Sequence, residues 1–163
     1  MSMIGNYRRI SAAALDALLA APETLASILY RGGRQGADRT LDVDKTWHLI
    51  HFLLNGDPWL GEWPLFGAVL GGTEVSDEDV GYGPARYLRP AEVAEVAAAL
   101  DPITPEVLWS RFDAAAAESA EIYPVPWAGG TDDQAYVTEY YAHLRRFFAA
   151  AARSGDAVLL YLN

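Results

Sequence analysis

Residues 41–54 have the sequence LDVDKTWHLIHFLL, in which apolar residues recur with the period of an amphipathic helix. We predict one helix over residues 41–55. Asp42 is expected to cap its first turn, and Gly56 is expected to end it. One arc of the helix is apolar and is predicted to face the core. This arc consists of Leu49, Ile50, Leu53 and Leu54.

Polar side chains occupy the opposite arc of the same helix, at steps of four, three and four residues. They are Asp44, His48, His51 and Asn55. Two histidines three residues apart can share a metal ion, with a carboxylate one turn earlier as third ligand. The HExxH zinc motif, however, has one more residue between its histidines and carries a glutamate base there. The alternative is that Asp44 pairs with a neighbour and His51 forms a hydrogen bond inside the core. We favour this structural interpretation and predict neither a metal nor a cofactor.

Short apolar-rich segments outside this helix predict strands at residues 3–10, 85–88 and 157–162. Most of the remaining chain has helical periodicity. The predicted fold class is therefore α+β: a mainly helical single domain over residues 1–163, with a small sheet formed by the N-terminal, middle and C-terminal strands.

Three segments are predicted as loops. Residues 31–39 are rich in glycine and arginine, and we prefer a solvated linker there to a phosphate-binding nest. Residues 57–64 contain two prolines and two tryptophans, whose rings we expect to be packed down. Residues 73–83 are acidic and are predicted to form an exposed loop.

The chain has a formal net charge of −10, with 22 acidic and 12 basic residues. This balance argues against nonspecific nucleic-acid binding, which needs clustered Lys and Arg, and it fits a basic protein partner. The absence of cysteine excludes disulfides and thiolate metal sites. No signal-peptide core is visible at the start of the chain, and no apolar run approaches the roughly 18 residues of a membrane span. We expect a soluble cytoplasmic protein that does not bind membranes.

Acidic and aromatic residues at 121–127 are candidates for a binding site beside the helix. Tyr123 and Trp127 are of the types that line a shallow pocket, but we favour the interpretation that both rings pack in the core. The candidate binding residues are Asp42, Asp44, Trp47, His51, Glu121 and Tyr123. No residue is assigned a catalytic role.

Several segments of the chain follow a known family pattern in order. They are MIG (3–5), LDVDKTW and LIHFLL (41–47 and 49–54), AVLGG (68–72), GPARYL (83–88), IYP (122–124) and GDAVL (155–159). With these segments the chain resembles the YfbM-like family, small bacterial proteins grouped as a domain of unknown function. The family pattern includes His51 but not His48. The resemblance implies a single α+β domain and no established activity, cofactor or catalytic residue.

These observations favour a non-enzymatic binding or protein-interaction module whose surface lies near the polar arc of the helix. The alternative is a small hydrolase that uses Asp44, His51 and a nearby carboxylate such as Glu121. Convergence of these groups with Tyr123 within hydrogen-bonding distance would favour the hydrolase. A closed surface with a large acidic face would favour the interaction module.

Overall fold

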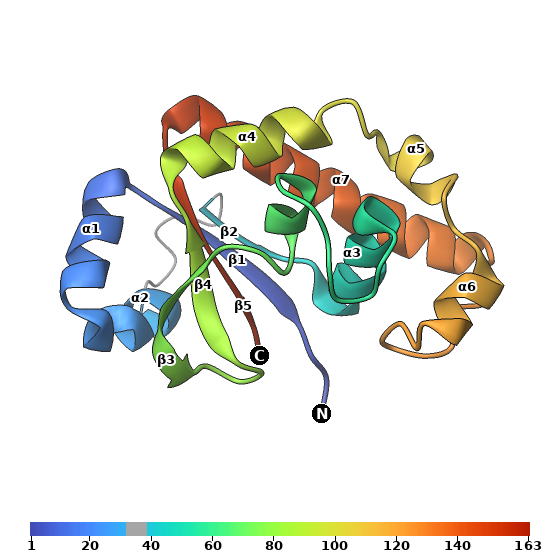
Figure 1. Ribbon diagram of the computed structural model, residues 1–163, viewed down its shortest axis with the longest axis horizontal. Helices are drawn as coiled ribbons and strands as arrows, with labels where there is room; N and C mark the ends of the chain where they lie inside the picture. The colour runs from blue at the N-terminus through green and yellow to red at the C-terminus, as the bar shows by residue number, and fades with distance from the viewer. Residues whose placement is uncertain (32–38) are drawn as a thin grey trace.

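The computed structural model describes residues 1–31 and 39–163 (Figure 1). The loop predicted at 31–39 therefore falls almost entirely outside the described residues. In chain order the elements, with η for a 3₁₀ helix, are β1 (Gly5–Ile10), α1 (Ala12–Ala20), η1 (Pro22–Thr24), α2 (Leu25–Arg31), β2 (Thr40–Asp42), η3 (Asp44–Thr46), α3 (Trp47–Asn55), η4 (Leu65–Ala68), β3 (Thr73–Asp79), β4 (Pro84–Leu88), α4 (Pro90–Leu100), α5 (Pro105–Trp109), α6 (Ala114–Ser119), α7 (Thr131–Ser154) and β5 (Ala157–Leu162).

The strands form one antiparallel sheet with the order β2-β1-β5-β4-β3. The three predicted strands are confirmed as β1, β4 and β5, and they lie at the centre of the sheet, so the α+β fold class is confirmed. The edge strands β2 and β3 are additional. β3 lies in the segment predicted as an exposed loop. Its side chains are mostly acidic and exposed, and Val75 is its one buried residue, so the sequence has no apolar alternation that marks a strand.

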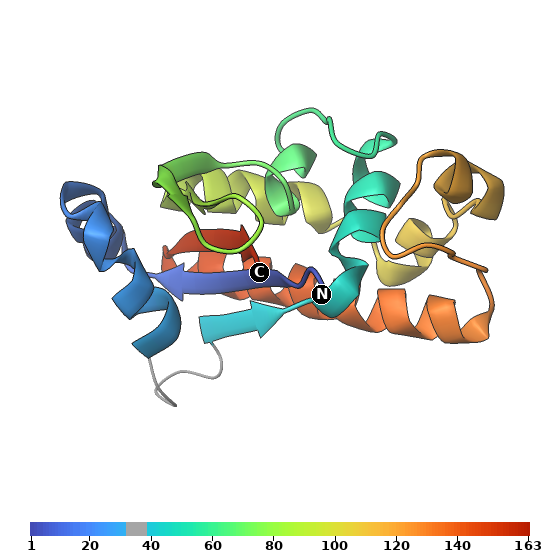
Figure 2. The same cartoon turned by 90° about the horizontal axis from the view of Figure 1, so that it is seen from below.

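Alternate residues of the strands point to opposite faces of the sheet, and each face has its own core. Tyr7, Val158 and Leu160 pack with residues of α3, α4 and α7 in the larger core. Ile10 and Leu159 pack with residues of α1 and α2 in the smaller one. Figure 2 shows α3 beside the end of the sheet, between the strands and the α5–α6 segment. The loops that follow α3 and α6 are thereby neighbours.

The α1–α2 pair covers the smaller core. Ser11 caps α1, because its hydroxyl accepts a hydrogen bond from the Ala14 N–H at 3.0 Å. No single described helix has both the length and the apolar composition to cross a membrane. Helix α1 and the segment Pro22–Tyr30 pass that test only as a pair, bent by 114°.

The central helix begins later than predicted. Residues Thr40–Asp42 pair with β1, and α3 starts only at Trp47. Between them Asp44 adopts a φ of 50°, a left-handed conformation that a continuous helix does not contain. Asp42 Oδ1 accepts a hydrogen bond from the Asp44 N–H at 3.1 Å, so Asp42 forms a turn and does not cap the helix. Pairing with β1 overrides the helical pattern of residues 41–46.

The C-terminal end and the apolar arc of α3 are confirmed. Gly56 has a φ of 74°, and its N–H donates to the Phe52 carbonyl oxygen at 2.7 Å. The predicted core residues, Leu49, Ile50, Leu53 and Leu54, are all buried. His48 and His51 are equally buried, with exposed fractions of 1% and 0%. The two histidines of the polar arc are therefore part of the interior, whereas Asp44 and Asn55 are half-buried.

Candidate functional site

His48 joins two loops to α3: residues 56–64, which follow α3, and residues 120–130, which follow α6. Its Nε2 lies 2.9 Å from the Pro58 carbonyl oxygen, and its Nδ1 accepts a hydrogen bond of 2.9 Å from the Tyr123 N–H. A carbonyl oxygen only accepts, so Nε2 carries the proton and the ring is neutral. Burial lowers the pKa of His48, in agreement with this state. One imidazole thus holds both loops against the same helix.

His51 is held in the same tautomer. Its Nε2 donates to the Leu60 carbonyl oxygen at 3.2 Å, and its Nδ1 accepts from the Asn55 amide at 3.3 Å. Burial is the main cause that lowers the pKa of His51 to about 4. His51 therefore fixes loop 56–64 at a second point, two residues beyond the one that His48 holds.

All four ring nitrogens of the two histidines are occupied by these hydrogen bonds. A metal or a proton would have to displace one of them. Asp44 does not join the pair, because its Oδ2 accepts a hydrogen bond of 2.7 Å from the Tyr136 hydroxyl. Over residues 1–31 and 39–163, no three His, Asp or Glu side chains are grouped so that they could hold a metal ion. The polar arc of α3 is a structural support.

Asp44 and Asp42 lie beside α7 instead. The Tyr136 hydroxyl that donates to Asp44 accepts from the Lys45 N–H at 3.3 Å. Burial, followed by the hydrogen bond to Asp44, raises the pKa of Tyr136. Asp42 is exposed and turns its carboxylate to the backbone of its own turn. Of these two candidate binding residues, Asp44 links the start of α3 to α7, and Asp42 shapes the turn before it.

Trp47 stacks with both His48 and Tyr123 in an aromatic layer. The centroid of the Trp47 ring lies 4.8 Å from that of His48 and 5.9 Å from that of Tyr123. Trp47 is 1% exposed and donates its indole N–H to the Met3 carbonyl oxygen at 3.0 Å. The Tyr123 hydroxyl accepts from the Met3 N–H, also at 3.0 Å. Trp47 is thus a packing residue, whereas Tyr123 is half-buried and reaches the surface.

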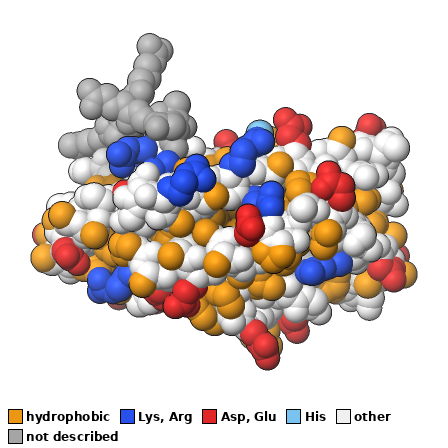
Figure 3. Space-filling model, turned by 90° about the horizontal axis from the view of Figure 1, so that it is seen from above, with side chains coloured by type: hydrophobic (Ala, Val, Ile, Leu, Met, Phe, Trp, Pro, Cys, Tyr) orange, Lys and Arg blue, Asp and Glu red, His pale blue; other side chains and the backbone are white. Residues whose placement is uncertain are grey.

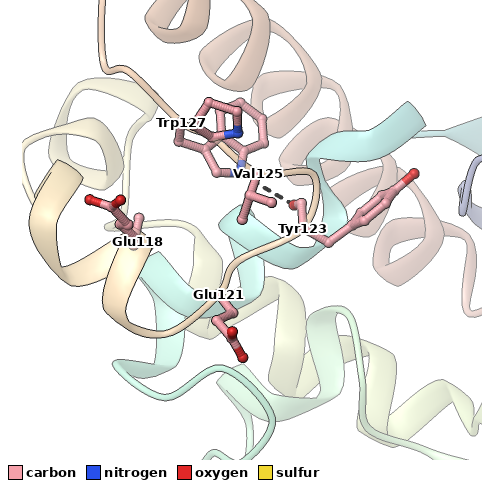
Figure 4. Close-up of a pocket in the computed structure, with 7 residues that line it drawn as sticks. Glu118, Glu121, Tyr123, Val125 and Trp127 are labelled. Atoms are coloured by element: carbon pink, nitrogen blue, oxygen red, sulfur yellow. Dashed lines mark hydrogen bonds between the residues drawn. The ribbon is translucent and has the colours of Figure 1, made fainter.

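A pocket of about 450 Å³ lies between α6 and loop 120–130. Its lining residues are Ala117, Glu118, Glu121, Tyr123, Val125, Pro126 and Trp127. Tyr123 and Trp127 both line this pocket, and Trp127 is also a buried member of the larger core, so each interpretation of these rings holds in part. The Trp127 indole N–H donates to the Tyr123 carbonyl oxygen at 3.3 Å, which fixes the ring (Figure 4). Glu118 lies across from Trp127 and Val125, whereas the Glu121 carboxylate points away from all three (Figure 4).

The residues of the hydrolase hypothesis occupy three separate places. Asp44 is bonded to Tyr136, His51 is bonded to Leu60, and Glu121 is exposed at the rim of the pocket. The structure does not bring these residues together as an acid, a base and a nucleophile. It brings together Trp47, His48 and Tyr123, of which His48 is outside the family pattern.

The most exposed large apolar side chains of this region were not among the candidates. Trp59, Leu60 and Val125 are 56%, 69% and 62% exposed. The Trp59 ring contacts His48, at 4.4 Å between centroids, but most of its side chain is exposed, and Trp63 is 43% exposed. The expectation that both rings of this loop are packed down is therefore wrong. Because His48 holds both loops, we group the three residues with the adjoining pocket as the two-loop surface. Its only sequence signal is the pair of proline- and tryptophan-containing loops.

A local turn displays two of these residues. Asp57 Oδ1 accepts hydrogen bonds from the Trp59 and Leu60 N–H groups, at 2.9 and 2.8 Å. These two bonds lower the pKa of Asp57 and keep its carboxylate charged. Asp57 thus holds the N–H groups of the turn, and His48 and His51 hold two of its carbonyl oxygens.

Charge is unevenly distributed along the chain. Residues 46–85 and 112–144 contain no Lys or Arg, yet each range holds six acidic residues, together 12 of the 22. Both loops of the two-loop surface lie in these ranges. The neighbouring Arg111 donates to the Leu53 carbonyl oxygen at the end of α3. Figure 3 shows one face of the molecule, on which Lys and Arg gather mainly at the left and centre.

The chain is a small α+β domain in which two loops are fixed to a buried helix. It belongs to the family described as "Domain of unknown function (DUF1877)", whose model matches residues 1–161. Its structure is similar to the crystal structure of YfbM from Escherichia coli, a protein of unknown function, with a TM-score of 0.76 and 24% identity over 98% of this chain and 99% of that chain. This likeness shows the fold alone. The resemblance to the YfbM-like family is confirmed. No curated protein sequence matches the chain.

Proposed function

We propose that this protein is a non-enzymatic protein-interaction module. Its two-loop surface binds a partner segment that combines apolar and basic side chains. The observation that carries the proposal is the exposure of Trp59, Leu60 and Val125 on loops that buried His48 holds in place. Large apolar side chains at fixed positions are typical of interface anchors, whereas single exposed ones scattered over a surface are not.

The support beneath the surface favours tight binding. A loop that orders only on binding loses conformational entropy, which weakens the complex. Here the hydrogen bonds of His48, His51 and Asp57 order the backbone of loop 56–64 before any partner arrives. The histidines that the sequence offered as candidates for a metal or catalytic site therefore contribute to binding by holding the loop in one conformation.

The charge around the surface favours a basic partner. Glu62, Glu118 and Glu121 are exposed on or beside the two loops, and the sequence ranges that contain them carry no Lys or Arg. Acidic groups at the rim of an apolar surface accelerate association with basic partners and disfavour acidic ones. The hydrolase alternative has no comparable support, because its residues lie apart.

A phage-displayed library of random peptides, panned on the full chain, tests the proposal. We expect the selected peptides to combine Lys or Arg with aromatic or aliphatic residues, and to bind in isothermal titration. The double variant Trp59→Ser/Leu60→Ser should weaken their binding by about tenfold or more, because it removes two apolar anchors. Tyr82→Ser is the matched control. Tyr82 is a 39% exposed aromatic on the turn between β3 and β4, and its loss should leave affinity unchanged.

Two results would overturn the proposal. One is a selected set without basic residues, or no selected peptide at all. The other is equal affinity of the selected peptides for the wild type and for the Trp59→Ser/Leu60→Ser variant, which would place their binding elsewhere.

A further inference from the structure

We infer that the pocket between α6 and loop 120–130 binds an organic cation with an apolar stem, supplied by an arginine or lysine side chain of the partner. The inference rests on the proposed function and specifies the chemistry by which the two-loop surface recognises its partner. Three features carry it: an aromatic and aliphatic wall, a carboxylate across from that wall, and the lack of any basic residue in this part of the sequence.

The wall of the pocket suits the stem of a long basic side chain. Val125, Pro126 and the small Ala117 contribute aliphatic surface, and Trp127 contributes an indole. Trp127 is 8% exposed, and its N–H is bonded to the Tyr123 carbonyl oxygen, so the ring keeps one orientation. Arginine and lysine bury their methylene stems along such surfaces and keep the charged group at the edge. A cation near an indole face is also attracted by the ring quadrupole.

The carboxylate of Glu118 supplies the complementary charge. Glu118 is exposed on α6 and lies across the pocket from Trp127 and Val125 (Figure 4). The range 112–144 around it contains Asp113, Glu121 and four other acidic residues but no Lys or Arg. The residues that line the pocket include Glu118 and Glu121 but no Lys, Arg or His, so an incoming cation meets an acidic rim.

The size of the pocket points to an organic group and not to a bare ion. Its volume of about 450 Å³ lies within the range of roughly 300–1,000 Å³ that is usual for small-molecule sites. Two nearby carboxylates that point in different directions do not form a metal site, whereas a carboxylate and an indole that line the same pocket suit a guanidinium or ammonium group.

The test compares two small probes on the full-length, ¹⁵N-labelled protein by NMR. Nα-acetylarginine N-methylamide carries the guanidinium group, and Nα-acetylcitrulline N-methylamide has the same stem with a neutral end. We expect the arginine probe to cause saturable shifts of the Trp127 indole N–H and of the backbone amides of residues 117–127. The citrulline probe should bind at least about fivefold more weakly, because it has lost both the charge pair and the cation–π contact.

Glu118→Gln keeps the shape of the side chain and removes its charge. It should weaken binding of the arginine probe by about threefold and leave binding of the citrulline probe unchanged. Glu106→Gln, on exposed α5, is the matched control and should change neither. Equal affinity of the two probes, or equal affinity of wild type and Glu118→Gln for the arginine probe, would overturn the inference.

The peptides selected on the two-loop surface separate this inference from the proposed function. If they bind while the arginine probe does not, the assignment of the pocket is wrong and the interaction surface stands. If the arginine probe binds while no peptide is selected, the chemistry of the pocket stands and the proposed partner is wrong.

Discussion

The polar arc of α3 looks like the functional site from the sequence alone, and the two-loop surface does not. The structure supports the opposite assignment. The arc contains histidines and an aspartate at helical spacing, the pattern of a chemical site, yet His48 and His51 are buried and fully hydrogen-bonded. The two-loop surface has no such pattern, yet it exposes Trp59 and Leu60. The comparison shows that polar residues at regular spacing can be buried and can hold a nearby loop in place. The exposed surface is then formed by residues of that loop.

The two histidines also differ from each other. His48 bonds to loop 56–64 and to loop 120–130, whereas His51 bonds to loop 56–64 and to Asn55 of its own helix. Loss of His48 should therefore separate the two loops, and loss of His51 should loosen only one.

The largest effect is expected from His48→Ala. The substitution leaves a cavity and removes the partners of two backbone groups, so we expect the free energy of unfolding to fall by about 3 kcal/mol. Urea denaturation measures this loss. Hydrogen exchange of the Tyr123 amide should also become faster, because that N–H donates to His48. His51→Ala should cost somewhat less and leave the Tyr123 amide protected. A loss below about 1 kcal/mol for His48→Ala would show that the ring does not hold the loops.

The next effect is a loss of stability in mild acid. The pKa of His51 is about 4 in the folded chain and 6.5 in the reference state, and that of His48 is also lowered. The unfolded chain therefore binds protons that the folded chain does not. The stabilisation is complete above pH 6.5 and is lost as the pH falls towards 4. For His51 alone we expect this loss to amount to about 3 kcal/mol.

Denaturation of wild type and His51→Ala across this pH range isolates the contribution of His51. The gap in unfolding free energy between the two proteins should be larger at neutral pH than near pH 4.5. A gap that stays constant would mean that His51 titrates normally and is not held as the structure shows.

A smaller effect is expected where the candidate carboxylates contact α7. Tyr136→Phe removes the hydrogen bond to Asp44 and the acceptor of the Lys45 N–H, and should cost about 1 kcal/mol in the free energy of unfolding. Asp44→Ala should cost a similar amount, and the double variant should cost less than the sum, because the two residues share one bond. Neither change should affect binding of the selected peptides. A loss of affinity in Asp44→Ala would show that Asp44 is part of the binding surface.

Much of the fold was predictable because it follows local patterns. The apolar run of β5, the arc of Leu49 and Leu53, and the stop at Gly56 are readable from residue order alone. The start of α3 could not be predicted from residue order. Residues 41–42 belong to β2 because they pair with β1, a contact between segments distant in the chain. The acidic strand β3 was also not predicted, because it is defined by its pairing with β4 and not by an apolar pattern.

The site was less predictable than the fold. Residue type alone made Tyr123 and Trp127 candidates for a pocket, with core packing as the favoured interpretation. The structure has both residues at a pocket, and Trp127 is also buried in the larger core. Nothing in the sequence indicates that a backbone carbonyl and a backbone N–H from separate loops meet on His48. Such contacts depend on backbone geometry, which leaves no residue signature. The exposure of Trp59 depends on the same geometry.

Chemical-shift mapping of a selected basic peptide on the ¹⁵N-labelled chain tests the central comparison most directly. We predict that the shifts concentrate at Trp59, Leu60 and residues 117–127, while the ring nitrogens of His48 and His51 keep their neutral, Nε2-protonated form. Shifts centred on Asp42 and Asp44, or a change in the protonation of either histidine on binding, would contradict the assignment of α3 as the support and the loops as the site.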